Sequence, residues 1–170
     1  LDISRIESGR YELEVSTVDL RTLIERVLRG VETKVAEHES ELHFEILDSL
    51  NVEADPKALD QIFVNLIHNA TKYTPKGSLI RIYEAKASRS NRVRICVEDN
   101  GPGIPDKYRP RLFERFYRVD KGRSRDAGGT GLGLAIVKHL VQAMAGDVGC
   151  DAAEPNGSIF WIEIPAHSER

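Results

Sequence analysis

Apolar residues recur at intervals of three and four in several parts of the chain, which is the spacing of one face of an α-helix. A first run follows Asp19, and its members are Leu20, Leu23, Ile24, Val27, Leu28 and Val31. A second run follows Asp55 and Pro56, and its members are Leu59, Ile62, Phe63, Leu66 and Ala70. An acidic cap and a proline at the first helical position are typical helix starts. The pattern predicts these two helices and a third over 132–145, which Gly146 ends.

Other segments alternate between apolar and polar residues, as a β-strand with one buried face does. The clearest case is Val93, Ile95 and Val97, and Asp99 falls on the same face directly after them. Strands are predicted over 11–15, 42–47, 79–87, 92–98, 148–152 and 158–164, with a hairpin turn at 88–91. Helices and strands therefore mix along the chain, and no internal repeat is present.

The second predicted helix carries a polar row beside its apolar one. Gln61, Asn65, Asn69 and Lys72 repeat at the same helical spacing. A solvated helix face is the simplest explanation, but asparagine is a poor helix former that a merely wet surface would not favour over Glu or Lys. The row is therefore a candidate binding surface. Because an amide oxygen suits a hard cation that is shared with phosphates, Asn69 is a candidate Mg²⁺ ligand.

Asp99 opens the sequence Asp-Asn-Gly-Pro-Gly-Ile at 99–104. An acid on the buried side of a strand end is rarely left without a partner. A carboxylate in this place can accept a hydrogen bond from the exocyclic amine of adenine, whereas guanine presents a carbonyl oxygen there. The motif therefore favours adenine over guanine.

A second glycine cluster, 128–133, precedes the third predicted helix. Backbone N–H groups at a helix start attract anions, because they lack intrahelical acceptors and lie at the positive end of the helix dipole. The cluster is not a P-loop, and Leu134 stands where a dinucleotide fingerprint needs Gly or Ala. Between the two glycine motifs, residues 106–126 hold eight basic and four acidic residues. A basic segment beside glycine loops suits a polyphosphate better than a nucleic acid.

Composition narrows the class of protein. The chain has 170 residues, of which 41% are hydrophobic and 30% charged, enough for one compact domain. Its net charge of −3 argues against a dedicated nucleic-acid binder. Cys96 and Cys150 match neither a disulfide framework nor a zinc spacing. The apolar stretches are far shorter than the roughly 20 residues that span a bilayer, so we expect a soluble domain.

Four motifs resemble the ATP-binding domain of sensor histidine kinases, within the GHKL group of ATP-binding proteins. Residues 65–75, Asn-Leu-Ile-His-Asn-Ala-Thr-Lys-Tyr-Thr-Pro, resemble its N box, and 99–104 resemble its first glycine box. Residues 113–118 resemble the F box, and 129–135 resemble the second glycine box. The resemblance spans nearly the whole chain. It implies a Bergerat-type α/β fold: a two-layer α/β sandwich, with a mixed sheet of about five strands, helices on one face, and ATP between helices and lid.

The resemblance also implies roles at the adenine end of the site. Asp99 would read the base, and Gly101 and Gly103 would let the backbone approach it. The full predicted ATP site is Asn65, Asn69, Lys72, Tyr73, Asp99, Gly101, Gly103, Ile104, Thr130, Gly131, Leu132 and Gly133.

At the other end, the resemblance implies that Asn69 holds Mg²⁺ and that Asn65 and Lys72 face the phosphates. Tyr73 would flank the ribose or the phosphates, and the backbone amides of 131–133 would cradle the phosphates. Arg118 would reach the γ-phosphate from the lid, where neighbouring cations could take its place. The predicted catalytic residues are therefore Asn65, Lys72 and Arg118.

Two departures from related patterns bear on the reaction. The ATPase branch of the group has a glutamate that activates water one helical turn before the magnesium asparagine, and this chain has Asn65 there. The kinases transfer phosphate to a histidine in a His-Glu/Asp-x-x-Thr/Pro box. The histidines that lack this context are His38, His43, His68, His139 and His167. We therefore expect transfer from Mg-ATP to a histidine outside this chain, with an ATP-holding binding module and a water-directed ATPase as alternatives.

The resemblance also implies a domain organisation and partners. Residues 1–10 resemble the end of a dimerisation helix and linker, and 11–170 would form the catalytic and ATP-binding domain. The expected partners are ATP, the dimerisation domain of the same kinase and the receiver domain of a response regulator, but not nucleic acid. We expect a monomeric fragment of a homodimeric parent, located in the cytoplasm, with the parent a candidate for membrane anchoring.

Overall fold

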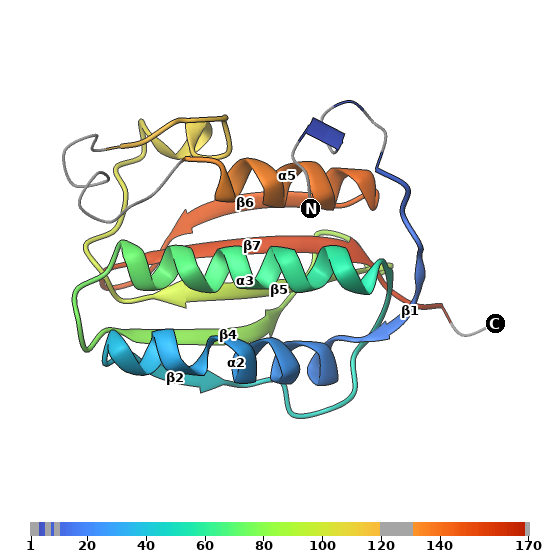
Figure 1. Ribbon diagram of the computed structural model, residues 1–170, viewed down its shortest axis with the longest axis horizontal. Helices are drawn as coiled ribbons and strands as arrows, with labels where there is room; N and C mark the ends of the chain where they lie inside the picture. The colour runs from blue at the N-terminus through green and yellow to red at the C-terminus, as the bar shows by residue number, and fades with distance from the viewer. Residues whose placement is uncertain (1–3, 6–7, 9–10, 120–130, 169–170) are drawn as a thin grey trace.

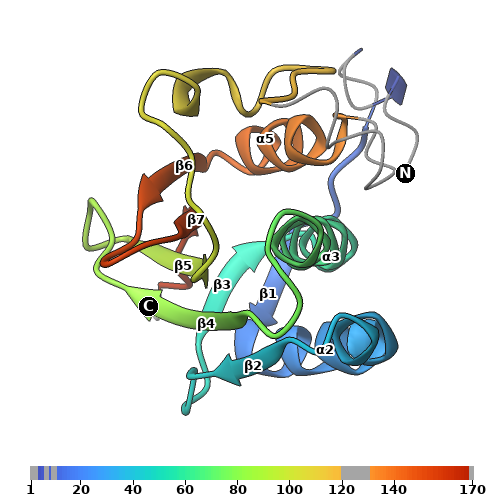
Figure 2. The same ribbon diagram turned by 90° about the vertical axis from the view of Figure 1, so that its left-hand side faces the viewer.

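A five-stranded mixed sheet forms one layer of the molecule, and helices form the other. The computed structural model describes residues 4–5, 8, 11–119 and 131–168. The strand order is β2-β4-β5-β7-β6, and α2, α3 and α5 lie on one face (Figure 1 and Figure 2). The elements are β1 (Ser16–Asp19), α2 (Leu20–Glu37), β2 (Glu41–Phe44), β3 (Asn51–Ala54), α3 (Pro56–Lys72), β4 (Leu79–Ala85), β5 (Arg92–Asp99), η1 (Arg109–Arg111), α5 (Gly133–Ala143), β6 (Asp147–Ala152) and β7 (Ser158–Pro165). The predicted α/β sandwich is confirmed.

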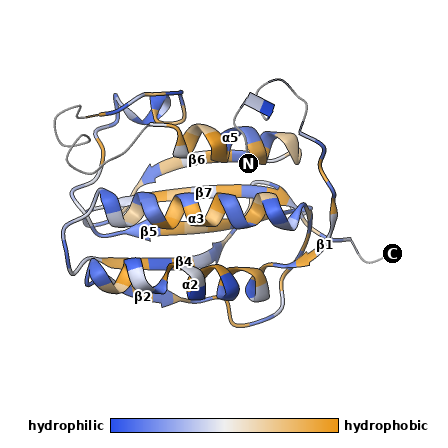
Figure 3. Ribbon diagram, viewed as in Figure 1, coloured by the Kyte–Doolittle hydropathy of each residue, from blue (hydrophilic) through white to orange (hydrophobic). Residues whose placement is uncertain are grey.

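Acidic caps start both long helices, as predicted. The Asp19 carboxylate accepts a hydrogen bond from the backbone N–H of Arg21 at 3.2 Å. The Asp55 carboxylate accepts from the backbone N–H groups of Lys57 at 2.9 Å and Ala58 at 3.3 Å. The five apolar residues predicted for the inner face of α3 are each at most 2% exposed. Figure 3 shows the matching mixture of hydrophobic and hydrophilic positions along α2 and α3.

Strand β5 lies between β4 and β7 and is antiparallel to both, whereas β2 and β4 are parallel. At the end of β5, Asp99 pairs with Ile80 on β4 and with Ser158 on β7. Val93, Ile95 and Val97 are at most 5% exposed and Asp99 is 7% exposed. The strand therefore delivers an acid to its buried side, as the alternating pattern predicts.

One strand prediction at the start of the chain is wrong, and another strand was missed. Residues 11–15 form no strand, and the ladder that follows them pairs β1 with β3, a strand that the sequence pattern did not indicate. Tyr11 and Leu13 pack against the core, while the backbone N–H of Glu14 donates to Asp55 at 3.0 Å. Their alternation thus reflects burial without strand pairing. A four-residue strand such as β3 is too short to show a clear period.

The predicted end of a dimerisation helix, over residues 1–9, lies mostly outside the described residues. The same holds for residues 120–126 of the basic segment and for Thr130.

The sheet face away from the helices is stabilised by charge pairs. Arg94 donates to the Glu163 carboxylate at 2.8 Å, and its guanidinium lies 3.9 Å from the centre of the Trp161 ring. Glu163 is 1% exposed and also accepts hydrogen bonds from the backbone N–H and the hydroxyl of Ser88, at 2.7 and 2.6 Å. The partners of this buried carboxylate are therefore all supplied within the protein.

Candidate nucleotide-binding site

A cavity of about 780 Å³ lies on the helix side of the sheet, bordered by α3, by the loop after β5 and by the start of α5. This volume is in the range of small-molecule sites. Its lining mixes apolar and polar groups. The predicted site residues that line it are Asn65, Asn69, Lys72, Tyr73, Asp99, Gly103, Ile104, Arg118, Gly131, Leu132 and Gly133. Segments far apart in the sequence thus meet around one cavity.

Asp99 forms the acidic end of the cavity. Its carboxylate accepts a hydrogen bond from the backbone N–H of Gly101 at 3.0 Å and another from the backbone N–H of Ser158. Burial raises the pKa of Asp99, and the two backbone hydrogen bonds oppose that rise. The two backbone donors aim the carboxylate and leave it further lone pairs for a ligand.

Gly101 is the exception among the described site predictions, because it does not line the cavity. A Cβ at this position would lie 2.8 Å from Cγ2 of Thr74 and 3.1 Å from Oδ1 of Asp99. The absence of a side chain thus lets the loop close over Thr74 while its N–H reaches Asp99. Its contribution to the site is structural support of Asp99 in this conformation.

The polar row of α3 faces the start of α5. Gln61 donates to the side-chain oxygen of Asn65 at 3.1 Å, and the side-chain amide of Asn65 donates to the carbonyl oxygen of Gly133 at 3.3 Å. Asn69 and Lys72 continue the row along the cavity wall. The row is therefore a cavity wall and not only a solvated helix face.

The start of α5 provides backbone donors. Leu132 is the N-cap residue, and because leucine has no side-chain acceptor, it provides no side-chain cap for the first-turn N–H groups. Gly131 has φ +75°, and a Cβ there would lie 2.8 Å from the Cα of Phe116. The backbone N–H of Phe116 also donates to the Gly131 carbonyl at 2.9 Å. Glycine is required here by both conformation and space, and it joins the F-box segment to the helix start.

Arg118 is the basic residue of 106–119 that lines the cavity. Arg109 instead donates to the carbonyl of Ile104 at 3.2 Å and pairs with Asp106. Arg111 pairs with Glu114 at 3.2 Å and stacks on Tyr117. In this structure Arg109 and Arg111 are thus held by these partners and do not line the cavity.

Several cavity residues were not predicted from the sequence. They include His68, Thr74, Leu112, Tyr117, Ser158 and Phe160. Ser158 and Phe160 were identified only as strand residues, and their register against β5 is what brings them to the cavity. The pKa of His68 is lowered by burial and by the charges of Lys34 and Lys72. His68 lies three positions after Asn65 and four before Lys72, so it shares the helical spacing of the polar row, and that spacing could have indicated it.

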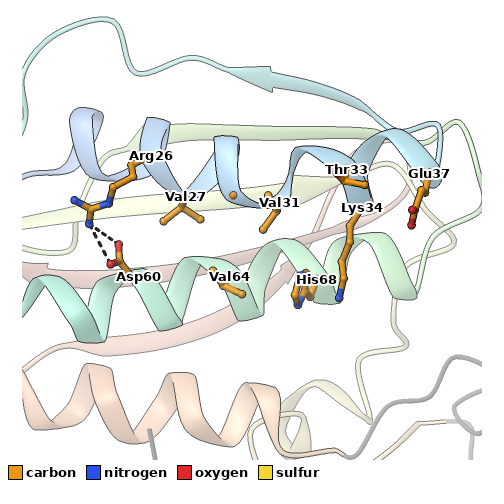
Figure 4. A pocket seen from close by; sticks show the side chains of 10 residues that line it. Arg26, Val27, Val31, Thr33, Lys34, Glu37, Asp60, Val64 and His68 are labelled. Atoms are coloured by element: carbon orange, nitrogen blue, oxygen red, sulfur yellow. Dashed lines mark hydrogen bonds and ion pairs between the residues drawn. The ribbon is translucent and has the colours of Figure 1, made fainter.

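His68 also lines a second hollow, of about 660 Å³, between α2 and α3 (Figure 4). Val27, Val31 and Val64 form its apolar part, and an ion pair between Arg26 and Asp60 at 2.8 Å spans it at one end. Gly30 leaves its middle open, because a Cβ there would meet nothing within 4 Å. This hollow lies outside the glycine motifs.

Over 11–119 and 131–168, no group of three or more His, Cys, Asp or Glu side chains could hold a metal ion. No helix among the described residues is long and apolar enough to cross a membrane.

Comparisons with known proteins identify the family. Residues 54–168 match the family described as histidine kinase-, DNA gyrase B-, and HSP90-like ATPase. The sensory/regulatory protein RpfC of Xanthomonas campestris pv. campestris is 38% identical over an alignment of 170 positions, and the match covers 97% of this chain and 23% of RpfC. The chain therefore spans about a quarter of the length of that relative.

Solved structures agree. The catalytic domain of histidine kinase ThkA superimposes with a TM-score of 0.79 and 29% identity, covering 91% of this chain and 97% of that one. ThkA has also been solved in complex with the response regulator protein TrrA, at a TM-score of 0.78 and 27% identity, covering 97% of this chain and 46% of that one. Full-length ShkA in complex with AMPPNP has a TM-score of 0.80 and 31% identity, covering 98% of this chain and 34% of that one. The chain thus belongs to the histidine kinase-, DNA gyrase B- and HSP90-like ATPase family, as a catalytic ATP-binding domain of the sensor histidine kinase type.

Proposed function

We propose that the chain binds Mg-ATP in the 780 Å³ cavity and donates the γ-phosphoryl group to a histidine on a separate dimerisation domain. One observation carries this proposal. A buried acid, Asp99, stands at one end of a cavity whose other walls hold Asn69 and the N-terminus of α5. An acceptor for a base amine and donors for phosphates thus face the same space.

At the adenine end, the ionised Asp99 carboxylate accepts a hydrogen bond from the exocyclic amine. The N–H groups of Gly101 and Ser158 hold it in place, so that little reorganisation is needed on binding. Ile104, Leu112 and Phe160 supply apolar surface for the base. Guanine would place a carbonyl oxygen against the carboxylate, which explains the proposed selectivity.

At the phosphate end, Asn69 is the proposed Mg²⁺ ligand. Its amide oxygen fits a hard cation that keeps several waters and shares phosphate oxygens, and such a site needs no cluster of carboxylates. A bound Mg²⁺ would neutralise charge on the β- and γ-phosphates during transfer. The backbone N–H groups of 131–133 and the Lys72 ammonium would orient the phosphates.

Arg118 and Lys72 are proposed to stabilise the charge that develops on the γ-phosphoryl group. Phosphoryl transfer depends on positioned charge more than on covalent participation by the protein. Asn65 holds the carbonyl of Gly133 and carries no carboxylate that could activate water. This favours a phosphoryl acceptor other than water.

The proposed organisation assigns 1–10 to the end of a dimerisation helix and 11–170 to the catalytic domain. The phosphoryl group would pass from the acceptor histidine to an aspartate of a response regulator, and the solved complex of ThkA with TrrA supports a partner of this class. We further propose that the fragment is monomeric, that its parent is a homodimer, and that the domain works in the cytoplasm.

The test is to incubate the chain with Mg²⁺, ATP labelled at the γ-phosphate, and a separately prepared dimerisation domain. Phosphohistidine on the added domain supports the proposal. Steady release of inorganic phosphate without phosphohistidine would indicate an ATPase, and ATP binding with neither product would indicate a binding module. An added domain whose histidine is replaced by glutamine is the matched control.

A further inference from the structure

The turn between β6 and β7, residues 153–157, packs directly against the backbone of the loop that carries Asp99. A Cβ at Gly157 would overlap the carbonyl group of Asp99, and a Cβ at Gly103 would lie 3.2 Å from the Gly157 carbonyl oxygen. The backbone N–H of Ala153 closes the turn by donating to the Gly157 carbonyl at 3.1 Å. Two backbone segments thus lie in contact, with glycines where they touch.

Asn156 is the side chain that links the two segments. Its side-chain amide donates to the carbonyl oxygen of Asn100 at 2.6 Å and to that of Gly101 at 3.1 Å. Because both partners are acceptors, the amide nitrogen and not the amide oxygen must face them. Asn156 does not line the cavity, so these hydrogen bonds act on the loop and not on a ligand.

The Asn100–Gly101 peptide connects this contact to Asp99. Its carbonyl oxygen accepts from Asn156, and its N–H donates to the Asp99 carboxylate at 3.0 Å. In a planar trans peptide these two groups point in opposite directions, so restraining the carbonyl also restrains the direction of the N–H. Asn156 and Asp99 therefore hold the same peptide plane from its two sides.

The Asn100 side chain ties the same loop to a second element, β4. Its oxygen accepts from the backbone N–H of Leu79 at 2.8 Å, at the start of β4. The loop is thus tied to β4 by Asn100 and to the 153–157 turn by Asn156. The contact to β4 uses the side-chain oxygen of Asn100, whereas the backbone carbonyl oxygen of Asn100 accepts from Asn156.

We propose that Asn156 is a positioning residue for adenine selection: it fixes the Asn100–Gly101 peptide so that the Gly101 N–H keeps Asp99 aimed at the base. This proposal rests on the proposed role of Asp99 in reading adenine. Without Asn156 the peptide can rotate, and Asp99 loses one of its two backbone donors. Binding energy that depends on the amine of adenine is then lost, whereas binding through the phosphates is retained.

The experiment compares ATP with ITP, a purine triphosphate that carries a carbonyl oxygen in place of the adenine amine. The dissociation constants of both are measured by titration calorimetry for the wild type, Asn156→Ala and Asn156→Asp. Asn156→Asp keeps the shape of the side chain and removes its donors. Glu154→Gln, in the same turn, is the control, and thermal unfolding without nucleotide verifies that each protein is folded.

We expect Asn156→Ala to weaken ATP binding about tenfold, the effect of losing the hydrogen bond between Asp99 and the base, and to change ITP binding less than about twofold. Asn156→Asp should reduce the preference for ATP at least as much, because a carboxylate would face two carbonyl oxygens. Glu154→Gln should keep the wild-type preference. A purely structural role for Asn156 would instead weaken ATP and ITP equally, and that result would overturn the proposal.

The variant Asp99→Asn separates a failure of the role proposed for Asn156 from a failure of the adenine assignment of Asp99. If it removes the preference for ATP while Asn156→Ala retains it, adenine reading by Asp99 stands and the role of Asn156 is refuted. If Asp99→Asn retains the preference, the adenine assignment fails and the role of Asn156 fails with it. In the double variant, Asn156→Ala should not reduce the preference beyond the effect of Asp99→Asn alone.

Discussion

Asp99 and Ser158 lie opposite each other at the ends of β5 and β7, and the backbone N–H of Ser158 donates to the Asp99 carboxylate. The acid is therefore held by a donor 59 positions later in the chain as well as by its own loop. A carboxylate fixed from two sides is pre-organised to accept a ligand donor.

Asp99→Asn should weaken ATP binding by about 1.5–3 kcal/mol, because it removes a hydrogen bond to a charged acceptor. Titration calorimetry with Mg-ATP measures the loss. Glu98→Gln is a matched control: Glu98 neighbours Asp99 in the sequence but pairs with Arg81 and Tyr83 on the other face of the sheet. Unchanged ATP affinity in Asp99→Asn would disprove the adenine assignment.

The pH dependence of ATP binding should reflect the same carboxylate. Burial raises the pKa of Asp99, so on acidification its charge is lost at a higher pH than for an exposed aspartate. ATP affinity should fall as the pH decreases through that pKa, and Asp99→Asn should lack this component.

The free energy of unfolding should depend on pH in the opposite direction. A pKa of Asp99 that is raised in the folded state stabilises the protein at low pH, and this contribution is lost as the pH rises through that pKa. The apo form of Asp99→Asn should thus be no less stable than wild type at neutral pH, as denaturant unfolding can measure.

Asn69→Ala should retain weak nucleotide binding and lose magnesium-dependent phosphoryl transfer, because the proposed Mg²⁺ ligand is removed while the adenine and phosphate contacts stay. The two measurements are ATP affinity with and without Mg²⁺ and phosphohistidine formation on an added dimerisation domain. Lys57→Ala, at an exposed position of the same helix that does not line the cavity, is the control. Full transfer activity in Asn69→Ala would contradict the assignment.

Gly30→Ala should stabilise the protein. Gly30 lies inside α2, and a Cβ there meets nothing within 4 Å. Alanine restricts the unfolded chain and favours the helix by about 1 kcal/mol, which corresponds to roughly 2–4 °C in Tm for a chain of this size. Differential scanning calorimetry measures this change in Tm. ATP affinity should stay the same, because Gly30 borders the hollow between α2 and α3 and does not line the proposed nucleotide cavity. A lower Tm would show that this hollow does not tolerate a methyl group.

Glu163→Gln should destabilise the fold by about 2 kcal/mol, because a buried acceptor for Arg94 and Ser88 loses its charge. Burial alone would raise the pKa of Glu163, but the hydrogen bonds from Ser88 and Arg94 lower it overall. A lowered folded pKa contributes stability above the unfolded pKa, and this stability is lost as the pH falls through the folded pKa. Urea unfolding at several pH values should therefore show a smaller acid-induced loss in Glu163→Gln than in wild type. An equal loss in both proteins would place the acid sensitivity elsewhere.

The sequence alone determined the elements whose signals are local. Helical spacing, the Asp55 cap and Pro56 predict α3, and alternation predicts β5 with Asp99 on its buried side, because capping and side-chain direction depend only on near neighbours. The motifs likewise indicate part of the cavity lining, such as Asn69, Gly103 and Gly131. The tertiary structure alone decided the strand register, and with it the contacts of Ser158 and of Asn156, which reaches Gly101 across 55 positions. Such contacts join groups without a shared period, so only the packing of the sheet and its turns brings them together.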